Sequence, residues 1–258
     1  MAELLQFSRP LPADDTFIRT AVADDILRSI DLVRHIEGPA MTMVSGAPGV
    51  GKTGTLDHYA RITGDASIMM TVAQGEGNPS HLASALMGYT PRGVGTDELR
   101  QPVMGCIGRG RVLLVDEAQH LYQRHRGTCT KGAGFEWLRA ASAEGGFDVA
   151  FCGDLTLHRI IDGFGQLSSR MRRPVIIPGV EPADVLAKEH AEGIAGANAN
   201  KLLTAAARLK GGLRNVENVA RMAKLFAADG TVTAGHIRAA LIDLKLVPKG
   251  ETDHANGS

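Results

Sequence analysis

The fold of this chain is decided by the run Gly46-Ala47-Pro48-Gly49-Val50-Gly51-Lys52-Thr53, which matches the phosphate-binding pattern G-x-x-x-x-G-K-[ST]. The run follows an apolar segment, 41–44, that predicts a strand, and it precedes a helical pattern. Glycines let backbone N–H groups turn towards phosphates, and the next helix presents its positive end to them. We predict that residues 46–53, with Gly54, bind a nucleoside triphosphate, Lys52 contacting the β- and γ-phosphates and Thr53 contacting Mg²⁺.

A second motif places two acids at the end of an apolar run. Residues 112–115 are Val-Leu-Leu-Val, which predicts a strand buried on both faces, and Asp116 and Glu117 follow directly. Mg²⁺ takes oxygen ligands, and an attacking water needs a base about one water away. We predict that Asp116 binds Mg²⁺ and that Glu117 activates water, so that the nucleotide is hydrolysed as well as bound.

Composition narrows the class of protein. A chain of 258 residues with 44% hydrophobic residues is long enough for one α/β domain and a small second one. Lys plus Arg equals Asp plus Glu at 28 each, so any binding to nucleic acid would use local patches. The three cysteines, Cys106, Cys129 and Cys152, lack metal-ligand spacing and predict reduced thiols. No apolar stretch approaches the roughly 20 residues that span a bilayer, so the expected location is cytoplasmic, with no membrane partner.

Strand patterns and helical patterns alternate as far as Pro178. The expected strands are 41–44, 67–72, 112–115, 149–152 and 175–177, and a helix is expected over 14–36. This alternation predicts an α/β fold in which helices cover both faces of a five-stranded parallel sheet. The predicted divisions are an N-terminal arm and helix (1–37), an α/β domain (38–179), a four-helix lid (180–247) and a disordered tail (248–258).

The lid is predicted from helical patterns without intervening strands. Its helices are expected at about 182–192, 200–210, 215–228 and 233–245. Gly211, Gly212 and Gly230 are the predicted helix stops. Asn215 and Thr233 are the predicted N-caps.

A phosphate loop, an Asp-Glu strand and a helical lid in this order resemble the AAA+ ATPases over residues 25–247. The resemblance implies that the nucleotide is ATP. It also implies a polar sensor after the fourth strand, where Asp154 stands in a position more often held by Asn. A neighbour-facing arginine is expected before the fifth strand, with Arg170 the first choice over Arg172 and Arg173, although a solvated basic turn also explains this run. A lid arginine is expected at Arg214.

Within the AAA+ ATPases, the run 116–121 (Asp-Glu-Ala-Gln-His-Leu), the compact size and the Gly-Leu-Arg lid motif resemble the Mu B, TniB and TnsC transposition group. That resemblance implies ATP-dependent homo-oligomers, helical filaments or rings, on duplex DNA of any sequence, and recruitment of a DDE transposase. Residues 120–134 contain no acid, which suits a cationic groove, although a solvated loop explains it equally well. The candidate DNA contacts are Arg92, Arg100, Arg124, Arg126 and Lys131.

Two alternatives stay open. An ATPase of the secretion or initiator type would share the Asp-Glu-Ala-Gln run but act on protein partners. Secretion relatives usually carry a membrane segment and initiators a winged-helix domain, and neither is expected in this chain. A nucleotide switch that does not hydrolyse would lack a use for Glu117 and Arg170, so these two residues favour an ATPase.

Overall fold

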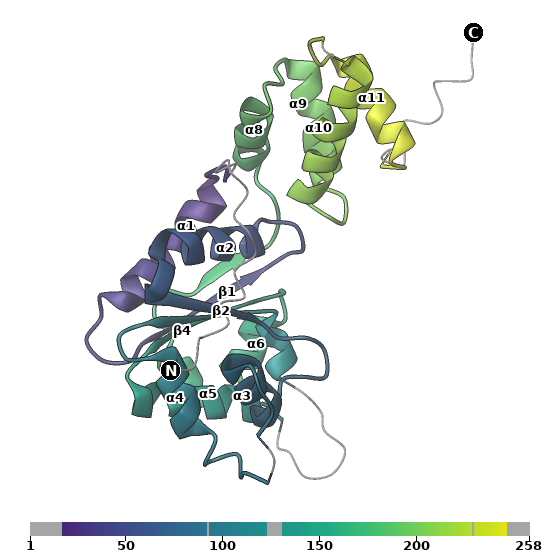
Figure 1. Cartoon of the computed structure of the whole chain (residues 1–258). Helices are drawn as coiled ribbons and strands as arrows, with labels where there is room; N and C mark the ends of the chain where they lie inside the picture. The colour runs from purple at the N-terminus through teal and green to yellow at the C-terminus, as the bar shows by residue number, and fades with distance from the viewer. Residues whose placement is uncertain (1–16, 92, 123–130, 229, 247–258) are drawn as a thin grey trace. The chain divides into compact units, whose positions relative to one another are not determined.

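The structure is a computed structural model that describes residues 17–91, 93–122, 131–228 and 230–246. Most of the predicted arm and the predicted tail therefore lie outside the described residues. Contacts divide the described chain into two units (Figure 1). We call them the sheet unit (17, 27–45 and 53–175) and the helical unit (18–26, 46–52 and 176–246).

The predicted five-stranded sheet is present. The strands are β1 (Met41–Gly46), β2 (Ser67–Thr71), β3 (Val112–Asp116), β4 (Asp148–Gly153) and β5 (Val175–Ile177). Their order is β2-β3-β4-β1-β5, and the ladders β2·β3, β3·β4 and β4·β1 are parallel. Every residue of β1, β3 and β4 is buried, as expected for strands that are covered on both faces.

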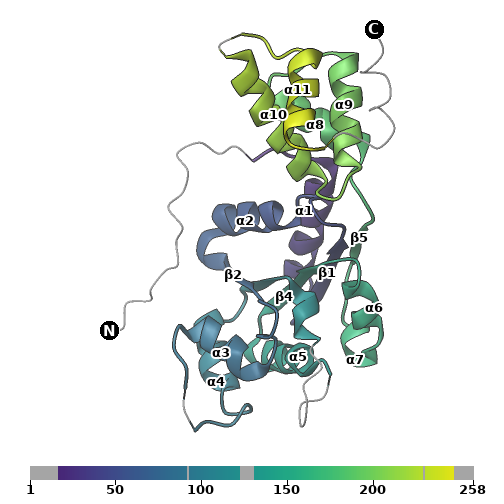
Figure 2. The ribbon, with the colours of Figure 1, turned by 90° about the vertical axis from the view of Figure 1, so that its right-hand side faces the viewer.

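Helices cover both faces of this sheet. In Figures 1 and 2, α2 lies on one face, and α3, α4 and α5 lie on the other. The core between the sheet and the second group contains Phe135 and Phe151, whose rings meet edge to face with centroids 5.3 Å apart. The helices that accompany the strands are α1 (Ala21–Arg34), α2 (Lys52–Thr63), α3 (Pro79–Met87), α4 (Arg100–Ile107), α5 (Ala133–Gly145), α6 (Leu157–Asp162) and α7 (Gly165–Ser168), with short 3₁₀ turns η1 (Gly64–Ala66) and η2 (Ala118–Leu121).

A polar cluster lies at the amino ends of β1 and β4. The phosphate loop and the Asp-Glu pair lie at the opposite, carboxyl ends of the strands. Asp148 begins β4, is 8% exposed, and accepts a hydrogen bond of 2.9 Å from the Ala40 N–H group. Burial raises the pKa of Asp148, against the lowering effects of that bond and of Arg34. Beside it the buried Tyr59 hydroxyl donates to Asp31 at 3.0 Å and accepts from Arg34 at 3.3 Å. Burial also raises the pKa of Tyr59.

A second buried polar contact holds the start of β1. The side chains of Ser29 on α1 and Thr42 on β1 are fully buried and lie 2.7 Å apart, oxygen to oxygen. Both hydroxyls reach the carbonyl oxygen of Arg173, at 2.7 Å from Ser29 and 3.2 Å from Thr42. The Arg173 backbone has a positive φ of 37°, a conformation that costs free energy in a residue other than glycine.

The helical unit contains the four helices predicted for the lid. They are α8 (Pro182–Ala191), α9 (Ala197–Ala207), α10 (Leu213–Ala227) and α11 (Ala234–Asp243). Leu203, Val216, Val219 and Ile237 are almost fully buried in their common core. The predicted N-cap at Thr233 is confirmed, because its hydroxyl accepts from the His236 N–H group and the His236 side chain returns the contact.

The predicted N-cap at Asn215 is wrong. Helix α10 begins at Leu213, two residues earlier, so Asn215 lies within its first turn. Its amide instead donates to the carbonyl oxygen of Ala206, in the last turn of α9, at 3.1 Å and to that of Lys210, in the following turn, at 3.3 Å. Asparagine was expected to cap the helix that follows it, but here its side chain satisfies one carbonyl group of the preceding helix and one of the turn after that helix.

Candidate nucleotide-binding site

The predicted phosphate loop joins the end of β1 to the first residue of α2. Gly49 and Gly51 have φ values of 77° and 96°, which side chains rarely adopt. Lys52 begins α2, and its ammonium group donates to the carbonyl oxygens of Gly46 at 2.7 Å and Ala47 at 2.9 Å. The cation is therefore held over the start of the loop at the positive end of a 12-residue helix, an arrangement that suits an anion.

Within the helical unit, the phosphate loop packs backbone against backbone on the turn before α10. The Leu213 N–H group donates to the carbonyl oxygen of Gly49 at 2.8 Å. A Cβ atom on Gly49 would overlap the carbonyl group of Gly211, and one on Gly212 would lie 2.7 Å from the carbonyl oxygen of Gly49. Gly211 and Gly212 were predicted only as helix stops. The structure gives Gly212 a second use, because a side chain there would collide with the phosphate loop, whereas a Cβ atom on Gly211 would overlap the side chain of Asn215.

The two sequence motifs meet through a hydrogen bond inside the sheet unit. The Thr53 hydroxyl, in the first turn of α2, donates to Oδ2 of Asp116 at 2.7 Å across 63 positions of sequence. Asp116 is 2% exposed, and its Oδ1 accepts from the Glu117 N–H group at 2.9 Å. A hydroxyl and a carboxylate are the oxygen ligands that Mg²⁺ takes, together with water and substrate phosphates. The pair therefore fits the predicted metal-binding role. No group of three or more His, Cys, Asp or Glu side chains in the described ranges forms a separate metal site.

Glu117, the predicted base, stands in an uncommon backbone conformation. Its φ is 54° and its ψ is 36°, in the left-handed region, at a cost of about 1–3 kcal/mol for a residue other than glycine. The residue is exposed. Its Oε2 accepts a hydrogen bond from the side-chain amide of Gln119 on η2. One carboxylate oxygen of this exposed residue is therefore hydrogen-bonded within the turn that follows β3.

Asp154, the predicted sensor, follows β4 directly. Its carboxylate Oδ1 accepts from the backbone N–H group of Thr156 at 2.8 Å and from the Thr156 hydroxyl. Its own N–H group donates to Oε1 of Gln119 at 3.2 Å, and its carbonyl oxygen accepts from the Ser45 hydroxyl at 2.8 Å. The side chain is thus used to shape the start of α6, while the backbone joins the ends of β1, β4 and η2.

The three candidate finger arginines differ in their contacts. The backbone of this run is fixed, because the Arg172 N–H group donates to the carbonyl oxygen of Met41 at 2.7 Å. Arg173 already has a further interaction within the chain. The side chains of Arg170 and Arg172 form no ion pair or hydrogen bond with any described residue. Arg214, the candidate lid arginine, is exposed as the second residue of α10.

A model described as AAA domain matches residues 34–161, and a model described as Mu B transposition protein, C terminal, matches residues 169–244. The chain is a Mu B-like AAA+ ATPase. The AAA domain match contains both the phosphate loop and the Asp-Glu pair, and the Mu B match contains the arginine run and the four helices α8 to α11. No curated protein sequence matches the chain.

Solved structures agree with the AAA+ fold. The Aeropyrum pernix ORC1 protein in complex with DNA is 16% identical with a TM-score of 0.62, over 90% of this chain and 68% of that one. Cdc6p from Pyrobaculum aerophilum is 12% identical with a TM-score of 0.61, over 89% and 69%. NtrX from Brucella abortus in complex with ATP is 19% identical with a TM-score of 0.55, over 93% and 57%. At these identities the likeness shows the fold alone.

The candidate DNA contacts of this AAA+ chain are only partly described. Arg92, Arg124 and Arg126 lie outside the described residues. Arg100 forms ion pairs with Asp97 at 3.1 Å and with Glu144 at 2.7 Å, so its charge is offset within the chain. Lys131 is exposed just before α5. Of the five candidates, the structure describes only Arg100 and Lys131, one from each of the two predicted basic segments.

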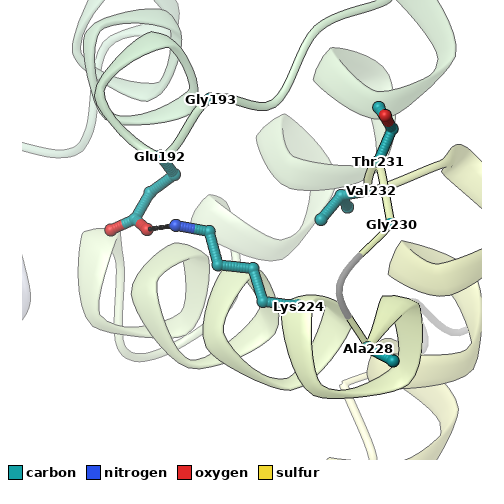
Figure 3. A pocket seen from close by; sticks show the side chains of 7 residues that line it. All are labelled: Glu192, Gly193, Lys224, Ala228, Gly230, Thr231 and Val232. Carbon is teal, nitrogen blue, oxygen red and sulfur yellow. Dashed lines mark hydrogen bonds and ion pairs between the residues drawn. The ribbon is translucent and has the colours of Figure 1, made fainter.

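A pocket of about 400 Å³ in the helical unit lies beside the ends of α8 and α10 (Figure 3). The side chains of Lys224 and Glu192 meet across it at 2.6 Å. These opposite charges offset one another, so the pocket presents no net charge to an ionic ligand.

No helix among the described residues has both the length and the apolar character needed to cross a membrane.

Sequence reasoning assigned no role to two residues that the structure places in this AAA+ site. Gln119 contacts both Glu117 and Asp154, and Ser45, which is fully buried, ties the end of β1 to Asp154. The signal for Gln119 was its position two residues after Glu117 in a short turn. Ser45 gave a weaker signal, as one hydroxyl near the end of an apolar strand.

Proposed function

We propose that this chain is an Mg²⁺-dependent ATPase that binds duplex DNA of any sequence, oligomerises on it as a filament or ring, and recruits or activates a DDE transposase. The observation that carries the proposal is that residues 169–244 match the Mu B transposition protein on a chain that also brings Thr53 and Asp116 together. The Mu B match supports a role in transposition, and the contact between Thr53 and Asp116 supports a functional nucleotide site.

Different residues of the site bind the phosphates, bind the metal and activate the water. The backbone N–H groups of residues 46–54 and the Lys52 ammonium group hold the phosphates, and Thr53 with Asp116 holds Mg²⁺. The metal supplies charge neutralisation on the phosphate oxygens. Glu117 accepts the proton of the water whose oxygen attacks the γ-phosphorus, and ADP leaves. The cofactors of this proposal are ATP and Mg²⁺.

Three more residues complete the proposed chemistry. Arg214 contacts the phosphates from the start of α10. Arg170 acts on the nucleotide of a neighbouring subunit, with Arg172 as its substitute, because neither guanidinium is used within the described chain and a phosphate needs a cation without a carboxylate partner. Asp154 contributes mainly through its backbone, since its carboxylate is engaged with Thr156.

Lys131 is the best placed of the described candidates for DNA. It is exposed, whereas Arg100 is neutralised by two carboxylates. A free cation binds phosphate oxygens of any sequence with an affinity that falls as salt rises. The alternative, an initiator-type ATPase that acts on protein partners, has the same fold as the ORC1 and Cdc6p structures, so the choice depends on binding rather than on architecture.

The test is fluorescence anisotropy of a random-sequence duplex titrated with the protein in ATP, ADP or a slowly hydrolysed analogue, at two salt concentrations. We expect cooperative, salt-sensitive binding with the triphosphates only. Lys131→Ala should weaken binding on every sequence, whereas the control Lys201→Ala, at an exposed position of α9, should not. Absence of DNA binding with every nucleotide would favour the protein-remodelling alternative.

A further inference from the structure

We propose that Gln119 is a positioning residue that sets the orientation of the Glu117 carboxylate. The inference rests on the proposed function, because it matters only if Glu117 activates water. Gln119 lies on η2, two residues after Glu117, and its side chain is half-buried. Its amide group connects the carboxylate to the backbone at the end of β4.

The two contacts of Gln119 fix which way its amide points. The nitrogen Nε2 donates to Oε2 of Glu117, and the oxygen Oε1 accepts from the Asp154 N–H group at 3.2 Å. Rotation of the amide by half a turn would place its oxygen against a carboxylate and its N–H groups against a backbone N–H group. Both contacts would then be repulsive, so one orientation is strongly favoured.

The backbone around Gln119 leaves space for this amide and holds η2 in place. A Cβ atom on Gly153, the last residue of β4, would overlap Oε1 of Gln119. On another side of η2, a Cβ atom on Gly77 would overlap the carbonyl group of His120. Because Gly153 and Gly77 have no side chains, η2 packs closely against the backbone at both positions. This close packing restricts movement of η2 and so of the Gln119 amide.

Glu117 needs such a restraint more than a buried acid would. Its side chain is exposed, and an unrestrained glutamate samples many rotamers. A base must be within hydrogen-bond reach of the water, and misplacement by about 1 Å can lower a rate about 100-fold. An amide that bonds one carboxylate oxygen leaves the other free to accept the proton of water.

The experiment measures ATP turnover and nucleotide affinity separately in Gln119→Met and Gln119→Glu. Methionine keeps the unbranched length without the amide, and glutamate places a second carboxylate against the first. We expect kcat to fall about tenfold or more in both variants while the affinity for a fluorescent ATP analogue and the melting temperature stay at the wild-type values. The matched control is Gln101→Met, at an exposed position of α4. Wild-type kcat in Gln119→Met would overturn the proposal.

A glycine pair tests the same contact from the opposite side. Gly153→Ala places a methyl group where the amide oxygen lies, so it should lower kcat as Gln119→Met does. Gly105→Ala, in α4, has no atom within 4 Å of the new methyl group and should turn over at the wild-type rate. Equal and unchanged kcat in both alanine variants would contradict the proposed contact.

A double variant separates this inference from the proposed function. If Gln119 acts through Glu117, adding Gln119→Met to Glu117→Gln should lower single-turnover hydrolysis no further, whereas an independent structural effect would add to it. Full turnover in Glu117→Gln alone would refute the assignment of Glu117 as base. Loss of turnover in Glu117→Gln combined with normal turnover in Gln119→Met would refute only the role of Gln119.

Discussion

The sheet unit has polar groups at both ends of its parallel strands, and they are used differently. At the amino ends, the side chains of Asp148, Tyr59, Ser29 and Thr42 are buried, and each hydrogen-bonds a neighbour within the unit. At the carboxyl ends, Asp116 is buried but Thr53 and Glu117 are exposed. We infer that the amino-end groups determine stability, whereas the carboxyl-end groups have hydrogen-bonding capacity available for a ligand.

The strongest way to sharpen this contrast is Glu117→Gln at the carboxyl end. The amide is nearly the same size but cannot accept the proton of water, so hydrolysis should fall by about 10²–10⁴-fold. Nucleotide affinity and melting temperature should stay unchanged, because the exposed carboxylate contributes little to stability. Steady-state ATPase assays and thermal melts check both parts. A large loss of stability would break the contrast between the two ends.

At the amino end, Asp148→Ala should show the reverse pattern. It removes the acceptor of the buried Ala40 N–H group, which costs about 1–3 kcal/mol in the free energy of unfolding. Turnover per folded molecule should stay at the wild-type value, since Asp148 lies at the amino end of β4, whereas the nucleotide site lies at the carboxyl ends of the strands. Urea unfolding followed by an ATPase assay measures both quantities, and a fall in turnover without loss of stability would contradict the division of roles.

Asp148→Asn adds a pH dependence whose sign follows from burial. The pKa of Asp148 is raised above its ordinary 3.8, so the folded state binds more protons than the unfolded state between the two values. The contribution of Asp148 to stability therefore falls as pH rises through this window. Asparagine still accepts from Ala40 but carries no charge. The Asp148→Asn variant should therefore be more stable than wild type at neutral pH and lose that advantage below about pH 4. Asp162→Asn, at an exposed residue, should show no such gain.

The difference between the two ends also explains what the sequence could predict. The carboxyl-end residues stand in short contiguous motifs, such as 46–53 and 116–117, whose spacing reflects the geometry of a phosphate site. The five strands and four lid helices were likewise predicted from local periodicity, and they are confirmed to within a few residues at their ends. The roles of the individual site residues remain predictions.

Contacts between distant segments could not be predicted in the same way. Ser29, Thr42 and Arg173 meet across more than 100 positions, and their sequence neighbours give no sign of it. The same holds for the amide of Asn215, which serves the helix before it, and for the contact of Gly49 with Leu213. Each depends on the order of strands or on the path of a turn, which periodicity within one segment does not determine.

The smallest expected effect is Ser29→Ala, which tests how far the amino-end groups support one another. The carbonyl oxygen of Arg173 accepts from both Ser29 and Thr42, so removal of one hydroxyl leaves the acceptor with a partner. The cost should be about 0.5–1.5 kcal/mol, the net value of one hydrogen bond, without a penalty for a buried group left unpaired. Ser29→Ala with Thr42→Val should cost more than the sum of the two single changes, because only the double variant strips this carbonyl of both hydroxyl donors. Additive losses in urea unfolding would show that the two hydroxyls act independently.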